Sequence, residues 1–206
     1  MGKLALLVID VQLDFCPGGA LAVEKGDEVA AAIAADLLGQ EAGYDYKVAT
    51  RDMHVAPGDH FSEMPDFVDS WPIHCLAGTP GAELHEALDS VRTEFDAIFD
   101  KGAYHAAYSG FEGAAPSGST LGPWLSARDV DRVDLVGLAT DYCVRATALD
   151  AAELGLAVRV LLGYTAGVAT STTLSAIDRL RTAGVEIVGP TTANGITWAA
   201  SMDKEA

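Results

Sequence analysis

The stretch TRDMHVAPGDH at 50–60 gathers residue types that bind metal ions. It holds Asp52, His54 and His60, and His74 follows in the next loop, so three of the chain's five histidines lie close together. Side chains two apart on an extended segment point the same way, so Asp52 and His54 can face one ion. One carboxylate and three imidazoles suit Zn²⁺, Fe²⁺ or Mn²⁺. The alternative is a hydrogen-bonded loop, but four such residues so close together favour the metal.

A second group of residues is suited to nucleophilic chemistry. Cys143 lies at the start of a helical pattern, where the helix N-terminus and a nearby lysine favour the thiolate. Asp10 would act as the base, Lys101 as the electrostatic partner and Cys143 as the nucleophile that attacks a carbonyl. Backbone N–H groups at the same helix start would hold the oxyanion. The alternative for Cys143 is a buried small hydrophobic residue, but Asp10 and Lys101 at neighbouring strand ends favour function.

The expectation that these residues meet comes from the predicted sheet. Short apolar runs alternate with helical patterns, which predicts an α/β fold with a parallel sheet and helices on its faces. Runs this apolar are typical of strands buried on both sides. Ligands bind at the carboxyl ends of such strands, where Asp10, Asp52, Lys101 and Cys143 are found. The six runs are 4–9, 46–50, 97–100, 133–138, 157–162 and 185–188.

Helices and long loops fill the intervals between these strands. The predicted helices cover about 29–37, 84–91, 142–155 and 170–183, and Asp141 is the predicted N-cap of the third. Two long loops are predicted, and loops of that length inside a compact domain are usually functional. The loops cover 52–80 and 102–118.

The organisation of the chain is predicted to be simple. Its 206 residues fit one domain over 1–190, followed by a C-terminal extension over 191–206. The early apolar run at 4–9 is too short to span a bilayer, and no cleavage-type segment follows it. We therefore expect no membrane association.

Charge and cysteine content exclude several classes of protein. The 13 basic and 30 acidic residues give a net charge of −17, which repels nucleic acids. Three cysteines without a secretion signal argue against a disulfide scaffold and for a reducing compartment, so we expect a cytoplasmic protein. No G-x-G-x-x-G follows the first strand, which argues against a dinucleotide-binding oxidoreductase.

Aromatic residues beside the proposed site residues suggest a wall for a flat ligand. Phe15, Trp71 and Tyr108 each flank a proposed site residue, although each could instead belong to the core. The remaining histidines and cysteines are expected outside the site, with His85 and His105 on the surface and Cys16 and Cys75 in packing.

Five segments together resemble the nicotinamidases of the isochorismatase-like cysteine hydrolase family, over about residues 3 to 189. The D-x-H-x5-H loop separates these enzymes from relatives that lack the metal. The segments are VIDVQLDFCPGGALAV at 8–23, TRDMHVAPGDHF at 50–61, WPIHCLAGTPGAELH at 71–85, KGAYHAAYSGFEG at 101–113 and GLATDYCVRATALDA at 137–151.

The resemblance implies a three-layer α/β/α fold with a six-stranded parallel sheet. It also implies hydrolysis of nicotinamide to nicotinate and ammonia through a thioester, activity on pyrazinamide, and a place in pyridine nucleotide salvage. The implied catalytic triad is Asp10, Lys101 and Cys143. One divalent ion of zinc, iron or manganese would be held by Asp52, His54, His60 and His74.

The resemblance further places a cis peptide between Leu138 and Ala139. Ala139 and Cys143 would form the oxyanion hole. Position 142 is tyrosine here and histidine in some relatives. With Tyr108 added from the aromatic pattern above, the implied substrate-binding residues are Phe15, Trp71, Tyr108, Leu138, Ala139 and Tyr142.

Two other functions compete with this expectation. A sibling hydrolase acting on carbamoyl amides or ureides would keep the triad but lack the metal loop. A ligand sensor on the same fold would keep the metal and bind a ligand without catalysing a reaction. The intact metal set argues against the first and the complete triad against the second. We expect a small-molecule substrate, nicotinamide, and a monomer or small homo-oligomer.

Overall fold

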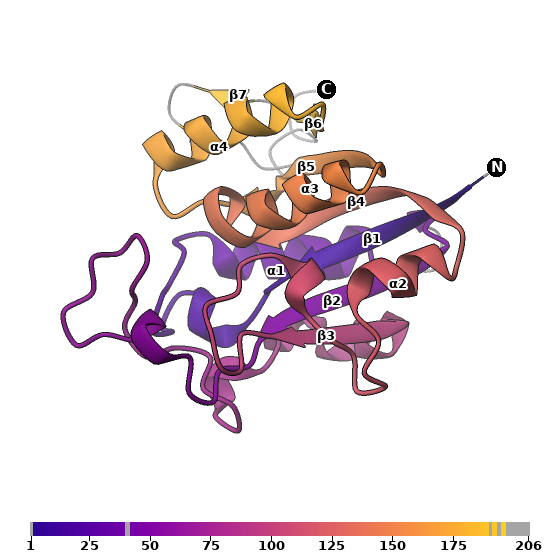
Figure 1. The fold of residues 1–206 in the computed structure, drawn as a ribbon. Helices are drawn as coiled ribbons and strands as arrows, with labels where there is room; N and C mark the ends of the chain where they lie inside the picture. The colour runs from indigo at the N-terminus through magenta and orange to yellow at the C-terminus, as the bar shows by residue number, and fades with distance from the viewer. Residues whose placement is uncertain (1, 40–41, 190, 193–194, 197–206) are drawn as a thin grey trace.

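Six parallel strands form one sheet in the computed structural model, which describes residues 2–39, 42–189, 191–192 and 195–196 (Figure 1). The strand order is β3-β2-β1-β4-β5-β6, so the order reverses between β1 and β4. All six predicted strands are confirmed. Their bounds are β1 Lys3–Ile9, β2 Tyr46–Asp52, β3 Ala97–Lys101, β4 Val130–Leu138, β5 Ala157–Ala166 and β6 Glu186–Val188.

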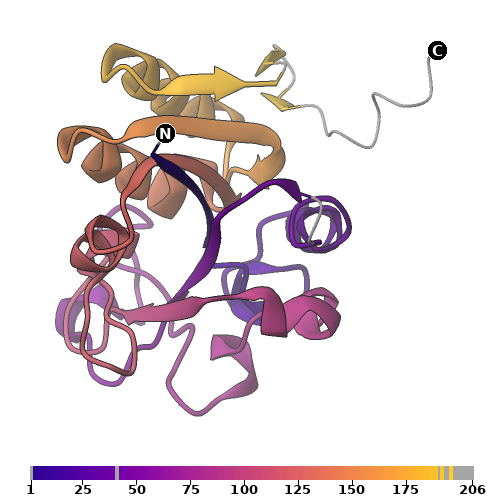
Figure 2. The same ribbon diagram turned by 90° about the vertical axis from the view of Figure 1, so that its right-hand side faces the viewer.

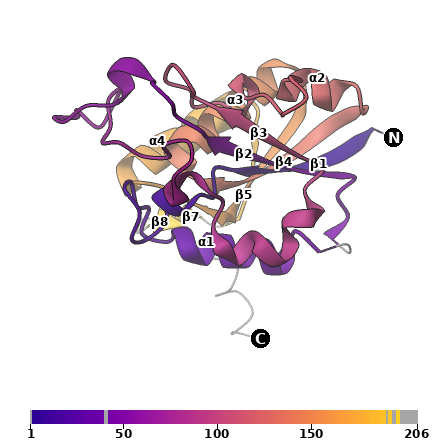
Figure 3. The ribbon, with the colours of Figure 1, turned by 90° about the horizontal axis from the view of Figure 1, so that it is seen from below.

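Helices cover both faces of the sheet and complete the three predicted layers. Leu6 and Val8 of β1 pack with the α-helix Gly26–Asp36 and the 3₁₀ helix Glu86–Glu94 on one face of the sheet. Leu7 and Ile9 face the other three α-helices. This alternation follows from the period of two along a strand. Figure 2 shows how the sheet twists from β3 to β6, and Figure 3 shows α1 on the opposite side from α2 and α3. The α-helices are α1 Gly26–Asp36, α2 Leu121–Ser126, α3 Arg145–Glu153 and α4 Thr170–Thr182.

Two of the predicted helices differ in detail from the expectation. The segment expected as a helix over 84–91 is the 3₁₀ helix η5, Glu86–Glu94. Before α3 the chain makes a π-helical turn, η7, Thr140–Val144. The N-cap of that turn is Ala139, so the prediction of Asp141 as the cap is wrong. The shorter 3₁₀ helices are η1 Leu13–Phe15, η3 Gly58–His60, η4 Pro80–Ala82 and η6 Gly110–Glu112.

The chain beyond β6 is described only in part. Two short strands, β7 Thr191–Thr192 and β8 Gly195–Ile196, pair antiparallel. The rest of the predicted extension over 191–206 lies outside the described residues. Among the residues that the structure describes, no helix is long and apolar enough to cross a membrane.

Gly137 allows β4 to lie close to β1 just before the site. Its φ is +109°, and an added Cβ would lie 2.1 Å from the Ile9 carbonyl oxygen. We expect Gly137→Ala to lower the free energy of unfolding by about 3 kcal/mol or more, measured by urea denaturation. Gly155→Ala is the control, since Gly155 also has positive φ but open space around it. It should cost about 1–2 kcal/mol, and an equal loss would contradict the steric argument.

Candidate active site

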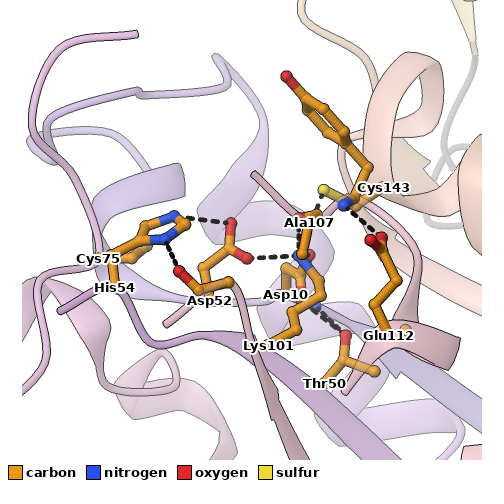
Figure 4. Close-up of polar contacts among 12 residues, drawn as sticks. Asp10, Thr50, Asp52, His54, Cys75, Lys101, Ala107, Glu112 and Cys143 are labelled. Atoms are coloured by element: carbon orange, nitrogen blue, oxygen red, sulfur yellow. Dashed lines mark hydrogen bonds and ion pairs between the residues drawn. The ribbon is translucent and has the colours of Figure 1, made fainter. Parts of the chain in front are cut away.

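Three strand ends bring Asp10, Lys101 and Cys143 together. Asp10 follows β1, Lys101 ends β3, and Cys143 lies in the π-helical turn after β4. The Lys101 Nζ lies 3.0 Å from Asp10 Oδ2 and 3.8 Å from the Cys143 sulfur (Figure 4). A carboxylate oxygen of Asp10 lies within 4.8 Å of that sulfur. The structure therefore brings the three residues together as the sheet-edge argument predicts.

Hydrogen bonds fix the two charged members of this group. Thr50 Oγ1 donates to Asp10 Oδ1 at 2.5 Å, which leaves Asp10 Oδ2 for the lysine and the thiol. Lys101 Nζ also donates to the Ala107 carbonyl oxygen at 3.0 Å and to Asp52 Oδ1 at 2.5 Å. The side chains of Asp10 and Lys101 are 0% exposed, so each charge depends on the other.

Burial dominates the protonation of the thiol. It raises the pKa of Cys143 well above the ordinary range; Lys101 opposes this shift and Asp10 adds to it. Lys101 favours the thiolate, in the direction predicted, but burial outweighs it in the resting site. Burial also raises the pKa of Asp10, and Lys101 only partly opposes it. This arrangement can pass a proton from sulfur to carboxylate at the moment of attack.

The histidine loop forms a buried cluster beside these residues. One ring nitrogen from each of His54, His60 and His74 lies within 4.8 Å of the others. The His54 Nδ1 contacts the Gly102 carbonyl oxygen at 2.6 Å, and the His74 Nδ1 contacts that of Pro72 at 2.8 Å. Such contacts orient ring nitrogens toward a metal. His54 Nε2 and His60 Nδ1 are buried without a hydrogen-bond partner.

The chemistry of this cluster fits a divalent transition metal. Burial, with smaller effects of His54 and His74, lowers the pKa of His60 to about 4, and burial also lowers the pKa of His74. Neutral imidazoles are the form that binds a metal. Asp52 Oδ2 lies 3.7 Å from His54 Nε2, so the fourth predicted ligand lies beside the histidine cluster.

Asp52 connects the histidine cluster to the lysine. Although burial opposes its charged form, Lys101 and His54 hold the pKa of Asp52 well below its usual range. Gln12 fixes its backbone, donating from Nε2 to the Asp52 carbonyl oxygen and accepting from the Asp52 N–H, both at 2.8 Å. Sequence analysis missed Gln12, whose only signal was a polar residue in an apolar run.

A cavity of about 310 Å³ opens onto both groups. The Trp71 indole N–H donates to the Tyr108 hydroxyl at 3.0 Å, and the rings of Trp71 and Tyr142 meet edge to face 5.1 Å apart. These rings form a wall suited to a flat ligand. The predicted residues that line the cavity are Phe15, Asp52, His60, Trp71, His74, Tyr108, Ala139, Tyr142 and Cys143.

Several residues lie elsewhere than predicted. Leu138 is fully buried in the core and does not line the cavity, although its peptide bond to Ala139 is cis. His85 is half-buried rather than exposed; its Nε2 lies 3.2 Å from Asp27 and its Nδ1 accepts from the Ala87 N–H. His105 is exposed, and Cys16 and Cys75 are buried, as predicted. Lining residues that sequence analysis missed are Ala20, Leu21, Ala22, Val23, Phe67, Ala107 and Val168, apolar loop positions without a chemical signal.

Comparison with known proteins shows the family of the chain. The model of the isochorismatase domain matches residues 4–191. The chain belongs to the isochorismatase family. It is 54% identical to the nicotinamidase/pyrazinamidase of Mycobacterium tuberculosis over 184 residues, which cover 89% of this chain and 97% of that protein.

Solved structures of a pyrazinamidase and of a nicotinamidase resemble this fold closely. The pyrazinamidase of Pyrococcus horikoshii in complex with zinc has a TM-score of 0.74 at 36% identity, covering 90% of this chain and 98% of that one. The yeast nicotinamidase bound to the inhibitor nicotinaldehyde has a TM-score of 0.78 at 29% identity, covering 90% of this chain and 99% of that one. Both match the fold over nearly their whole length.

Proposed function

We propose that this protein hydrolyses nicotinamide to nicotinate and ammonia. The observation that carries the proposal is one cavity with a buried Asp–Lys–Cys group and a buried histidine cluster on its walls. The 54% identity to a nicotinamidase/pyrazinamidase supports the substrate class. Pyrazinamide also carries a carboxamide on a nitrogen-containing aromatic ring, so the same cavity should accept it.

The reaction begins with transfer of the thiol proton. Asp10 takes the proton from Cys143, and the sulfur adds to the amide carbon. Lys101 stays charged beside both residues, since Asp10 and Asp52 outweigh its burial and raise its pKa well above the ordinary range. Backbone N–H groups of Ala139 and Cys143 would hold the oxyanion.

Collapse of this adduct releases the first product. Asp10 returns the proton to the amide nitrogen, the carbon–nitrogen bond breaks, and ammonia leaves a thioester on Cys143. Water then attacks the thioester while Asp10 accepts its proton. The carbon–sulfur bond breaks and the proton on Asp10 returns to the sulfur. The acid loses its remaining proton to solvent and leaves as nicotinate.

We further propose that Asp52, His54, His60 and His74 hold one divalent ion of zinc, iron or manganese. The unpartnered nitrogens of His54 and His60 and a zinc-bound relative support this assignment. When bound, the ion would supply a template that orients the pyridine nitrogen. Trp71 and Phe15 would flank the ring.

Ammonia release from nicotinamide tests both parts of the proposal. The purified protein should release ammonia as isolated, at a rate that falls at least about tenfold after chelation and returns with one added divalent ion. The metal content of each sample, measured by mass spectrometry, shows whether chelation removed the ion. Nicotinamide and an N-carbamoyl amide should be compared side by side, since a sibling hydrolase would prefer the second.

The outcomes that would contradict the amidase activity differ from those that would contradict the template role of the metal. Unchanged ammonia release from protein shown to be metal-free would overturn the template role and leave the amidase. Tight binding of nicotinamide without ammonia release under any added metal would support a sensor and overturn the amidase.

A further inference from the structure

Asp141 is a fully buried carboxylate that the proposed reaction does not use. It lies two residues before Cys143 in the π-helical turn, yet its side chain points to the segment after β5. Its Oδ1 accepts from the Val168 N–H at 3.0 Å, and its Oδ2 accepts from the Ala169 N–H at 3.3 Å. The Thr172 hydroxyl also donates to Oδ2. A buried charge with this many donors is well satisfied.

These donors belong to the start of α4. The N-cap residue of α4 is Ala169, whose side chain cannot accept a hydrogen bond. The Asp141 carboxylate, 27 to 31 residues away in the chain, accepts from the two backbone N–H groups that precede the helix and from the Thr172 hydroxyl in its first turn. A negative charge at a helix N-terminus is also favoured by the helix dipole. Asp141 therefore anchors the start of α4 and is not the N-cap of the helix that follows it in the chain.

This contact joins α4 to the turn that carries Cys143. That turn begins at Ala139, whose carbonyl oxygen accepts from Tyr142 and Val144 N–H groups. Other side-chain contacts of the turn include the hydrogen bonds from Thr140 to the Thr165 hydroxyl and from Thr147 to the Cys143 carbonyl oxygen. Asp141 is the buried carboxylate of the turn, and its three hydrogen bonds fix the direction of the backbone between Ala139 and Cys143.

We propose that Asp141 is a positioning residue for the oxyanion hole, acting through the N-terminus of α4. The inference rests on the proposed function, since it assigns the Ala139 and Cys143 amides to the substrate oxygen. Asp10, Lys101 and the thiol do not contact Asp141 in the described residues, so activation of the sulfur should not depend on it. Loss of Asp141 should thus separate transition-state stabilisation from nucleophile activation.

The main test is the isosteric variant Asp141→Asn. We expect kcat for nicotinamide to fall roughly 10²- to 10³-fold, the cost of losing an oxyanion-hole donor, with KM changed less than about threefold. The affinity for nicotinaldehyde, whose adduct with a thiol carries an oxygen into the hole, should fall in parallel. Nicotinate affinity and the rate of Cys143 alkylation by iodoacetamide should stay within about twofold of the wild type.

Two further variants show whether the effect runs through α4. Thr172→Val removes one donor to Asp141 and should reproduce part of the loss in kcat. Asp134→Asn is the matched control, because Asp134 is equally buried but pairs with Arg159 and Tyr44 away from the cavity. It should lower stability and leave kcat and nicotinaldehyde affinity unchanged.

The positioning role also has a readout that needs no substrate. Amide hydrogen exchange at residues 139–144 should be faster in Asp141→Asn than in Asp134→Asn. Equal exchange there, or a parallel fall in kcat and alkylation rate, would overturn the proposal. If the wild type releases no ammonia, the proposed function fails, and the exchange result still decides whether Asp141 holds the turn.

Discussion

Replacing Cys143 with alanine should abolish ammonia release from nicotinamide, with a fall in kcat of at least about 10⁴-fold. The Cys143 sulfur is the one thiol that lines the cavity in the described residues, and it lies beside Asp10 and Lys101. Water cannot replace it efficiently, because the thioester route divides a difficult amide hydrolysis into two easier steps. The measurement is steady-state ammonia release with the protein shown to be folded by circular dichroism.

Cys16→Ala is the matched control for this prediction. Cys16 is buried like Cys143, but it packs against Gly26 rather than opening onto the cavity. The control should keep kcat within about threefold, since it removes only a small apolar contact. Cys143→Ala should still bind nicotinate. Wild-type turnover in Cys143→Ala would show that the thiol is not the nucleophile.

Replacing Lys101 with methionine should damage stability and activity together. Lys101 is the cation between the buried carboxylates of Asp10 and Asp52. Its removal leaves two buried negative charges without compensation, which we expect to cost about 3–5 kcal/mol of unfolding free energy at pH 7. Urea denaturation measures this loss, and ammonia release should become undetectable.

The stability loss in Lys101→Met should shrink as the pH falls. In the wild type the pKa of Asp52 lies below its unfolded value, so that stabilisation is present at neutral pH and is lost in acid. Without the lysine, burial raises the folded-state pKa of both carboxylates above the unfolded values. The variant therefore binds more protons when folded and gains stability from pH 7 to pH 5. The experiment uses chelated protein throughout, so that metal binding does not contribute.

A double variant separates the two effects of Lys101. Lys101→Met with Asp10→Asn removes one of the uncompensated charges and should recover part of the stability without recovering activity. A double variant as unstable as the single one would contradict the electrostatic explanation and indicate a packing defect.

The chemistry-bearing residues were predictable because they follow simple rules of position. Asp10, Lys101 and Cys143 each follow an apolar run, and the ends of parallel strands meet at one edge. His54 and His60 were conspicuous because histidine is rare in this chain. Strand prediction succeeded for the same reason, since runs as apolar as that of β1 are buried on both faces.

What sequence analysis missed depends on contacts between distant segments. Asp141 looked like an N-cap because it precedes a helix, but its partners lie at Val168 and Ala169. Phe67 and Val168 line the cavity from loops that carry no periodic signal. The protonation of Cys143 also depended on burial, a property of the assembled fold that the neighbouring residues in sequence do not determine.

The strand order has a consequence for the newly made chain. Because β1 pairs with both β2 and β4, the centre of the sheet stays open until residues near Leu138 have been synthesised. The histidines and Lys101 emerge first, and the sulfur emerges after them. Pairing over such a separation is slow to form. Cys143 therefore meets Asp10 and Lys101 only once β4 has paired with β1, so a half-folded chain has the sulfur without the base that the proposed reaction needs.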